Sequence, residues 1–488
     1  MSRQLRRRTG HRRRSAAGLL AVLAALVALL LVAGGGTAIT ATRATFIPDR
    51  IPVVGRTGTI CTVGAKQGDS STSLSAVVMR QAPGRDGTLT GTPSAAAAPS
   101  FTLTEQGKGQ VLPGFSRTVL LEGKGVMATA STASVVTVAT TGAEEGLMAA
   151  PCQPPRSGSW LVGVGAGRSY RSELVLTNPD DAQAEVNLRY YGRNGLVVVP
   201  GSPGVVVAAR SSTVVALEPL VAVEGPLTVA VRAEHGRVVA VARSLATSGQ
   251  RPTGADWHLP SSAPSLRTVI PGIPEGDGTR ELFVVNPGTT RAQVGVEVLG
   301  EQGSFAPAGA ETIEVPPEST AAVQLADGLA GAAGAVRLTS DVPVTGSMVS
   351  RSTRPTATPD LAVQSAAPAM LRTGLVAVAT TDAADSELVM SNDTDTEVSV
   401  SMEVLSYAGV TLRRDDILLA PNSTATRGLN SPAPSYLVVR APGNIGVYGG
   451  VVLSQPEGAS AGLTTMVVSS PDVASRAPRV RHDPTVGR

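Results

Sequence analysis

The chain has 488 residues, which is long enough for roughly three or four domains of ordinary size. Hydrophobic residues make up 42% of it and aromatic residues only 3%, and 53 Gly and 35 Pro interrupt its valine-rich segments, so the composition favours strands and turns. Residues 1–14 hold seven of the 41 basic residues and no acidic residue. The rest of the chain therefore carries 34 basic against 38 acidic residues, which argues against a nucleic-acid partner.

An uncharged segment, residues 15–42, follows the basic N-terminus. Its most apolar part would span about 27 Å as a helix, enough to cross the hydrocarbon core of a bilayer. The arginines before it predict a cytoplasmic N-terminus, with everything after residue 42 outside the membrane. The alternative is a secretory signal that is cleaved near residues 37–41, although signal peptides have shorter apolar regions of about 7–15 residues. The sequence therefore predicts a single-pass signal anchor in the cell membrane, with a secreted protein as the alternative.

Beyond this segment the chain repeats itself. An apolar strand that ends in Asn-Pro or Asn-Asp occurs three times, and its Asn positions, Asn178, Asn286 and Asn392, lie 108 and 106 residues apart. Asn before Pro or Asp is typical of a turn, so a structural role in turns is predicted for the three Asn residues. A fainter copy, interrupted by a low-complexity segment at residues 92–100, begins near Cys61.

Each copy continues in the same way. An alternating strand, a glycine turn and a Ser-Thr connector follow the Asn, and two more strands close the copy; we align Thr213, Thr320 and Thr424 as the ends of the connectors. Six to eight short strands in roughly 106 residues are typical of an immunoglobulin-like β-sandwich. A β-propeller, in which each copy supplies two blades, is the alternative.

The predicted fold is thus all-β, with an N-terminal transmembrane helix followed by about four tandem immunoglobulin-like β-sandwich repeats. The predicted boundaries are a cytoplasmic basic tail at 1–14, the transmembrane signal anchor at 15–42, β domains at 56–152, 156–262, 265–367 and 370–471, and a disordered tail at 472–488.

The segment from Gly146 to Gly163, which contains Cys152-Gln153-Pro154-Pro155 and Trp160-Leu161-Val162, resembles an uncharacterised family of actinobacterial cell-envelope proteins, as does the strand that ends at Pro179. The likeness covers about residues 50–470. The resemblance implies one N-terminal membrane segment followed by a domain of unknown function. Members of this family are often described beside membrane glycosyltransferases, which implies a role in envelope assembly. The resemblance supplies no activity and no functional residues.

The chain has two cysteines, Cys61 and Cys152, both after the predicted anchor. An even number of cysteines outside the cytoplasm predicts a disulfide. The pair brackets the divergent first copy, and closing that loop would contribute about 4–5 kcal/mol in the chain-entropy model. Two free thiols are the alternative.

Nothing in the sequence predicts a catalytic site, a metal site or a cofactor. The four His residues lack ligand spacing, and a Gly-x-Ser-x-Gly motif is missing. Paired acidic residues in predicted loops are read as solvated turns. Calcium between neighbouring domains is the alternative reading for two of these pairs, Asp180 with Asp181 and Asp393 with Asp395.

The expected function is therefore a membrane-anchored extracytoplasmic scaffold or interaction protein of the bacterial cell envelope, accessory to envelope glycan assembly. Its expected partners are the membrane and either an envelope glycosyltransferase or wall glycan. A glycan-binding module is one alternative, and it would use exposed rings of Trp257, Tyr190 and Tyr191. An envelope carbohydrate-active enzyme with carboxylates across a cleft is the other.

Overall fold

The structure is a computed structural model of the whole chain. It describes residues 24–27 and 55–471, except residues 65–67, 81–85, 95–99, 222–223, 330, 353–356, 379–383, 430, 432–433, 444–445 and 456–461. The chain forms two units, one from Val53 to Ala474 and one from Met1–Pro52 with Ser475–Arg488. Of the second unit only residues 24–27 are described, and they are helical.

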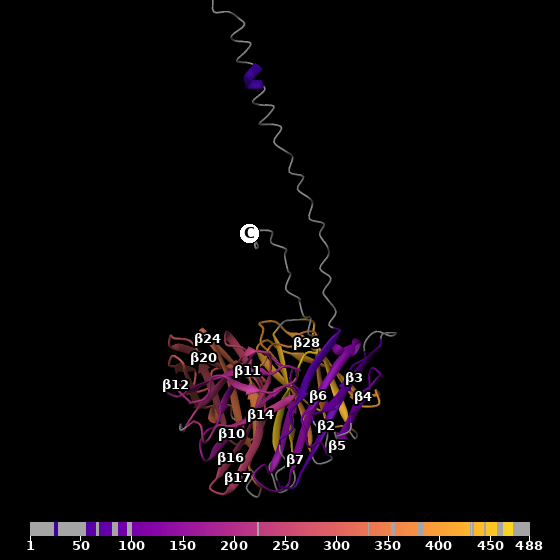
Figure 1. The fold of residues 1–488 in the computed structure, drawn as a ribbon, viewed down its shortest axis with the longest axis horizontal. Coiled ribbons are helices and arrows are strands. Elements are labelled where there is room, and N and C mark those ends of the chain that lie inside the picture. Colours follow the sequence, from indigo (N-terminus) through magenta and orange to yellow (C-terminus); the bar gives the residue numbers. More distant parts are fainter. Residues whose placement is uncertain are drawn as a thin grey trace, which may run out of the picture. The chain divides into compact units, whose positions relative to one another are not determined.

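The unit from Val53 to Ala474 consists almost entirely of antiparallel strands, which confirms the predicted all-β class (Figure 1). Its strands fall into four repeats. The first repeat contains β1 (Arg56–Cys61), β2 (Ser70–Val78), β3 (Gly87–Pro93), β4 (Phe101–Leu103), β5 (Gly109–Pro113), β6 (Val119–Gly125), the 3-10 helix η1 (Val126–Ala128), β7 (Ser131–Ala139) and β8 (Gly146–Pro151). The second contains β9 (Gly158–Val164), β10 (Tyr170–Asn178), β11 (Ala184–Gly192), β12 (Gly195–Val197), β13 (Val205–Val207), β14 (Ser211–Ala216), β15 (Leu227–His235), β16 (Val239–Ser248) and β17 (Arg251–His258).

The third and fourth repeats follow the same plan. The third contains β18 (Ser265–Ile273), β19 (Arg280–Asn286), β20 (Ala292–Gly300), β21 (Gly303–Phe305), β22 (Thr312–Val315), β23 (Ser319–Gln324), α2 (Ala326–Leu329), β24 (Gly334–Ser352) and β25 (Asp360–Ser365). The fourth contains β26 (Thr373–Val378), β27 (Asp385–Asn392), β28 (Val398–Ser406), β29 (Thr411–Leu419), β30 (Ser423–Gly428), β31 (Ser435–Arg440), β32 (Val447–Ser454) and β33 (Leu463–Val467).

Each repeat makes two sheets, which we call its leading sheet and its closing sheet. The leading sheet contains the first strand of the repeat, in the order β9-β15-β11-β12 in the second repeat. The closing sheet contains the last strand, in the order β17-β16-β10-β14. In the third repeat the long strand β24 passes from one sheet into the other, pairing first with β18 and β20 and then with β19 and β25.

Aliphatic side chains fill the space between the two sheets of a repeat. In the second repeat, Leu161 and Leu188 of the leading sheet pack with Leu174 and Ala240 of the closing sheet. Such a core, enclosed by two facing sheets, is the packing expected of a sandwich. The cores contain few rings, as the composition predicts, because alternating Val, Leu and Ala suffice to cover a pleated sheet.

The repeats also pack on one another, and in a cyclic order. The leading sheet of the second repeat meets the closing sheet of the third, where Val162 and Tyr191 pack against Phe283. The leading sheet of the fourth meets the closing sheet of the first, and the leading sheet of the first meets the closing sheet of the second. The four predicted β repeats therefore bury the apolar outer faces of their sheets against each other within one unit.

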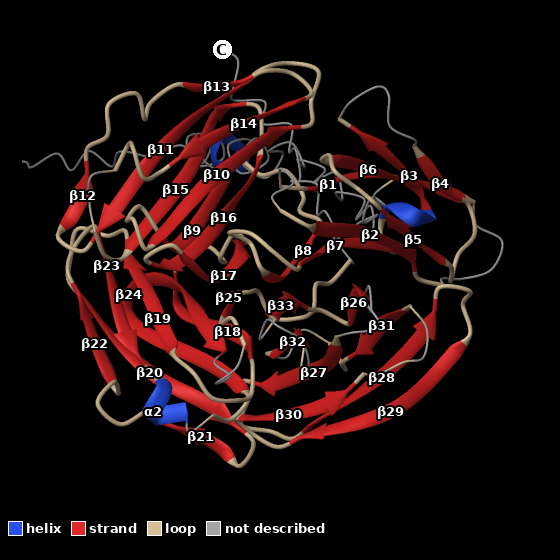
Figure 2. Ribbon diagram, turned by 90° about the horizontal axis from the view of Figure 1, so that it is seen from below, coloured by secondary structure: helices blue, strands red, loops and turns tan. Residues whose placement is uncertain are grey.

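The last strands β8, β17, β25 and β33 lie together at the centre of this arrangement (Figure 2). Their described side chains are almost all buried. The centre is thus filled by four strands, one from each repeat. No helix among the described residues is long and apolar enough to cross a membrane, and the predicted anchor at 15–42 lies outside them apart from residues 24–27.

Candidate functional site

The most unusual chemistry of the molecule lies at the centre, where the four last strands meet. The chain places Gly146, Gly254, Asp360 and Gly462 at corresponding positions of these strands: Gly146 and Asp360 begin β8 and β25, Gly462 directly precedes β33, and Gly254 is the fourth residue of β17. Three repeats thus have glycine at this position, and the third repeat has a carboxylate. We call the set of these four positions and the residues directly after them the hub.

The carboxylate of Asp360 accepts one backbone hydrogen bond from every repeat. Its Oδ2 accepts from the amide of Leu147 at 2.8 Å and from the amide of Leu463 at 2.9 Å. Its Oδ1 accepts from the amide of Leu361 at 2.9 Å and from the amide of Ala255 at 3.3 Å. One side chain therefore links all four repeats.

The glycines provide the space for this carboxylate. A Cβ atom at Gly146 would lie 2.2 Å from Asp360 Oδ2, and one at Gly254 would lie 2.5 Å from the amide nitrogen of Leu361. Both glycines also have a positive φ, 136° and 123°, which other residues rarely adopt. A side chain at Gly146 would collide with the carboxylate of Asp360, and one at Gly254 with the backbone of Asp360 and Leu361.

The ionisation of Asp360 depends on two opposing effects. Burial raises the pKa of Asp360 to about 7, while the four amide donors act to lower it. Four N–H groups occupy the four lone-pair positions of a carboxylate, and a proton on either oxygen would face one of these donors. The hydrogen-bond geometry is therefore that of the anion, held by charge-assisted bonds in place of water.

A second polar layer lies next to the first. Asp256 accepts from the amide of Val363 at 2.9 Å and from the hydroxyl of Thr464 at 3.0 Å, and that hydroxyl in turn accepts from the amide of Ala149 at 3.0 Å. Burial raises the pKa of Asp256 well above its ordinary value, and the neighbouring charge of Asp360 raises it further. This layer, too, joins all four repeats.

His258 ends the same strand as Asp256 and is held as a neutral ring. Its Nδ1 lies 3.1 Å from the carbonyl oxygen of Val162, which can only accept, so Nδ1 carries the proton. Its Nε2 then accepts from the hydroxyl of Tyr170 at 2.7 Å. Burial lowers the pKa of His258 to about 4, although the bond to Val162 acts in the opposite direction.

Both carboxylates and the imidazole are buried, and their hydrogen-bonding positions are occupied by the protein itself. A general acid or base must reach a reacting group. Asp360, Asp256 and His258 are therefore placed to hold the repeats together, and their buried atoms are not accessible to a substrate.

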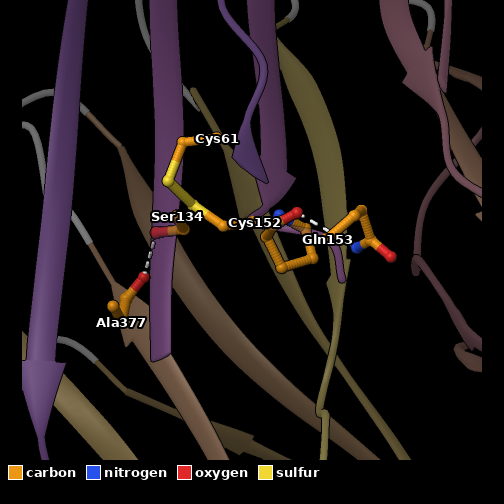
Figure 3. Close-up of a disulfide and its surroundings, with 6 residues drawn as sticks. Cys61, Ser134, Cys152, Gln153 and Ala377 are labelled. Carbon is orange, nitrogen blue, oxygen red and sulfur yellow. Dashed lines mark hydrogen bonds between the residues drawn. A yellow bond between two sulfur atoms is a disulfide. The ribbon is translucent and has the colours of Figure 1, made fainter. Parts of the chain in front are cut away.

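The disulfide predicted between Cys61 and Cys152 is confirmed, with a Cα–Cα distance of 4.3 Å (Figure 3). It joins the end of β1 to the residue after β8, and the backbones of Ile60 and Gln153 exchange two hydrogen bonds beside it. On the neighbouring strand, the hydroxyl of Ser134 donates to the carbonyl of Ala377 in the fourth repeat. The divergent first repeat is thus covalently closed and bonded to the last one.

The repeated Asn residues close turns in the same way in each copy. The carboxamide nitrogen of Asn286 donates to the carbonyl oxygens of Thr290, Val315 and Pro316, and its oxygen accepts from the amide of Gly288. Asn178 and Asn392 make the corresponding four bonds. Each Asn therefore ties the turn that follows its strand to the connector about 30 residues later.

The connector alignment needs one correction. In the strand pairing, Asn178, Asn286 and Asn392 stand opposite Ser211, Ser319 and Ser423. The residue that corresponds to Thr320 and Thr424 is therefore Ser212, and the predicted Thr213 is one position too far. In the sequence, both Ser211-Ser212 and Ser212-Thr213 could be the connector pair, and only the register of the strand pairing decides between them.

The rings considered for glycan contact do not form an exposed platform. Trp257 is buried between the first and second repeats, Tyr190 lies in the core of the second, and Tyr191 packs at the junction of the second with the third. Trp257 is buried because its strand lies at the centre of the molecule, which the sequence alone cannot show.

Three of the four acidic residues considered for calcium are paired with arginines, and the fourth, Asp395, accepts from Asn422. Asp180 bonds to Arg237 and Asp181 to Arg210. Asp393 lies 2.8 Å from both Arg267 and Arg337. Among the described residues there is no group of three or more His, Cys, Asp or Glu side chains arranged to hold a metal ion.

The hub escaped sequence analysis, although it leaves a weak signal. Asp360 is a single acidic residue at the start of an apolar strand, at a position where other copies have glycine. The fold of the repeats would be needed to see that the four positions meet.

One protein family matches the chain, over residues 104–430, and it is described as a family of unknown function, DUF5719. No curated protein matches the chain.

Proposed function

The chain belongs to the family of unknown function DUF5719, and we propose that it is a membrane-anchored scaffold on the outer side of a bacterial cell membrane, where it supports the assembly of envelope glycan. The observation that carries the proposal is the hub, in which one carboxylate joins four repeats into a single body. A platform that presents partners in a fixed arrangement needs such rigidity, because ordering a flexible platform on binding would weaken the affinity.

The disulfide supports a location outside the cytoplasm. Stable disulfides form in oxidising compartments and are rare in the reducing cytoplasm. Cys61 and Cys152 are also the only cysteines of the chain, so the pairing leaves no thiol for another role. The arginines of residues 1–14 and the uncharged residues 15–42 supply the sequence pattern of an anchor with its N-terminus inside.

The link to glycan assembly rests on the resemblance to envelope proteins and is the part of the proposal most in need of a test. The full chain with a C-terminal affinity tag is crosslinked in its native envelope, purified and analysed by mass spectrometry. The matched control is residues 1–55 with the same tag, which retains the anchor and lacks the four repeats.

Recovery of a membrane glycosyltransferase or a polymer-export component with the full chain, and not with the control, is the expected result. Equal recovery with both would mean that the repeats bind no partner, and the scaffold proposal would then fail. Recovery of wall glycan without any protein would favour a glycan-binding module instead.

A further inference from the structure

Three of the four junctions between repeats share a contact at the outermost strand of the closing sheet. The hydroxyl of Thr320 in β23 donates to the carbonyl of Tyr191 in the preceding repeat at 2.8 Å. The hydroxyl of Thr424 in β30 donates to the carbonyl of Leu299 at 2.7 Å. At the junction of the fourth repeat with the first, the amide of Gly109 in β5 donates to the carbonyl of Tyr407 at 2.9 Å. Three outer strands are thus bonded to the repeat that covers them.

The outer strand of the second repeat, β14, differs. Ser212 corresponds to Thr320 and Thr424, which are 0% and 2% exposed, yet Ser212 is exposed. Val214 is exposed to 58%, whereas its counterparts Ala322 and Thr426 are partly buried. We call Ser212, Val214 and Ala216, the three outward residues of this strand, the β14 face.

The β14 face keeps the hydrogen-bonding chemistry of the covered strands. In the fourth repeat, the hydroxyls of Ser391 and Thr424 lie 2.7 Å apart, and Thr424 also donates to the neighbouring repeat. In the second repeat the hydroxyls of Thr177 and Ser212 form the same pair, 2.8 Å apart. One proton of such a pair bridges the two oxygens, and the other can be donated to a further acceptor.

Val214 is one of the twelve large hydrophobic side chains that are exposed in the described chain. Leu196 and Val206 are also exposed and near it in sequence, but their strands β12 and β13 belong to the leading sheet. The large apolar group of the β14 face is therefore Val214.

The β14 face continues an interface that already exists. The same side of the closing sheet buries Val175 and Val241 against Ile60 of the first repeat. Among the described residues, the first repeat thus covers the inner strands of this sheet, while Val214 on the outer strand stays 58% exposed.

We propose that the β14 face binds an extended segment of a protein partner, one that brings a backbone carbonyl to Ser212 and an aliphatic or aromatic side chain to Val214. Tyr191 and Leu299 supply the carbonyl at the covered junctions, and Ala322, the counterpart of Val214, packs against the cluster that contains Tyr191. The inference deepens the scaffold function and rests on it.

The size of the face favours a single segment over a second copy of the chain. Stable dimers bury about 800 Å² on each partner. One strand with three outward residues offers much less than this, and it matches the width of a peptide that binds along a strand.

The test uses the full chain in its native envelope, with the photo-crosslinking residue p-benzoylphenylalanine in place of Val214. The matched control carries it in place of Leu418, which is 60% exposed on β29, an outer strand of the fourth repeat. The crosslinked peptide of the partner is then sequenced by mass spectrometry.

The expected result is a crosslink from position 214, and not from position 418, to an extended stretch of alternating apolar residues in a protein that also copurifies with the unmodified chain. Val214→Asp should lower that copurification at least tenfold, whereas Leu418→Asp should leave it unchanged. Equal melting temperatures of the two variants would show that folding is unaffected.

A crosslink from position 214 to the same chain or to a second copy, or no crosslink at all, would overturn the inference. A partner that copurifies normally with Val214→Asp would overturn it as well, and the scaffold function would stand. Loss of all partners from the unmodified full chain would instead refute the proposed function.

Discussion

Replacing Asp360 with Asn tests the hub, because it exchanges one carboxylate oxygen for an NH₂ group with almost no change of shape. Asn keeps one carbonyl oxygen, which can still accept from two of the four amides. Its NH₂ group replaces the other acceptor and points a donor at two buried N–H groups. The variant therefore loses two charge-assisted bonds and leaves two amides, each from a different repeat, without an acceptor.

The magnitude follows from the number of bonds. Hydrogen bonds to a charged group contribute about 1.5–3 kcal/mol each, so losing two removes about 3–6 kcal/mol. Removing a buried charge returns part of this, because its desolvation is no longer needed. We expect Asp360→Asn to lower the free energy of unfolding by about 3–5 kcal/mol.

The assay is urea unfolding of the full chain in detergent, followed by tryptophan fluorescence, since Trp257 is buried in the same strand as Ala255 of the hub. Asp181→Asn is the matched control, because Asp181 is an exposed partner of Arg210 and should leave the midpoint unchanged. A loss below about 1 kcal/mol for Asp360→Asn would refute the reasoning, since such a loss is typical of an ordinary surface substitution.

Three further predictions concern the disulfide, Gly146 of the hub, and His258. Replacing Cys61 and Cys152 together with Ser should lower the free energy of unfolding by about 4–5 kcal/mol, and reduction of the wild-type protein should have the same effect in urea unfolding. Gly146→Ala should be strongly destabilising, because its Cβ would lie 2.2 Å from a carboxylate oxygen, whereas Gly195→Ala meets no atom within 4 Å and tests the cost of a positive φ alone. Between pH 7 and pH 4, the unfolding midpoint of His258→Gln should decrease less than that of the wild type.

The sign of the pH prediction follows from the direction of the shift. The folded protein holds His258 neutral down to about pH 4, while the unfolded chain binds a proton near pH 6.5. The stability from the neutral ring is thus present above pH 6.5 and is lost as the pH falls towards 4, by up to about 3 kcal/mol. Asp360, whose pKa is raised, acts in the opposite direction. The difference between wild type and His258→Gln isolates the histidine, and parallel curves would contradict the prediction.

The other two predictions have their own contradicting results. A double Cys variant as stable as the wild type would show that the sheets of the first repeat need no crosslink. Equal effects of Gly146→Ala and Gly195→Ala would show that the hub has room for a methyl group beside the carboxylate.

The sequence predicted what local chemistry controls. Alternating Val and Leu fixed the strands, and the Asn-Pro and Asn-Asp pairs marked the turns that Asn178, Asn286 and Asn392 close. The disulfide followed from cysteine number and compartment. These features depend on residues that are near in the chain or have only one available partner.

The sequence could not predict what depends on the packing of one repeat against another. Asp360 is unremarkable in its own strand, and its role appears only when amides from Leu147, Ala255 and Leu463 converge on it. The glycan-binding alternative required an exposed Trp257, yet this residue lies in a central strand that is buried between the first and second repeats.

Native-state hydrogen exchange of the amides of Leu147, Ala255, Leu361 and Leu463 would test most directly whether one carboxylate holds four repeats as a single body. The account predicts that the four amides exchange with one common free energy of opening, close to that of global unfolding. In Asp360→Asn, this free energy should decrease for all four amides by the same amount. Four different free energies, or a fall confined to Leu361 in the variant, would mean that the repeats open independently and would remove the rigid body on which the scaffold function depends.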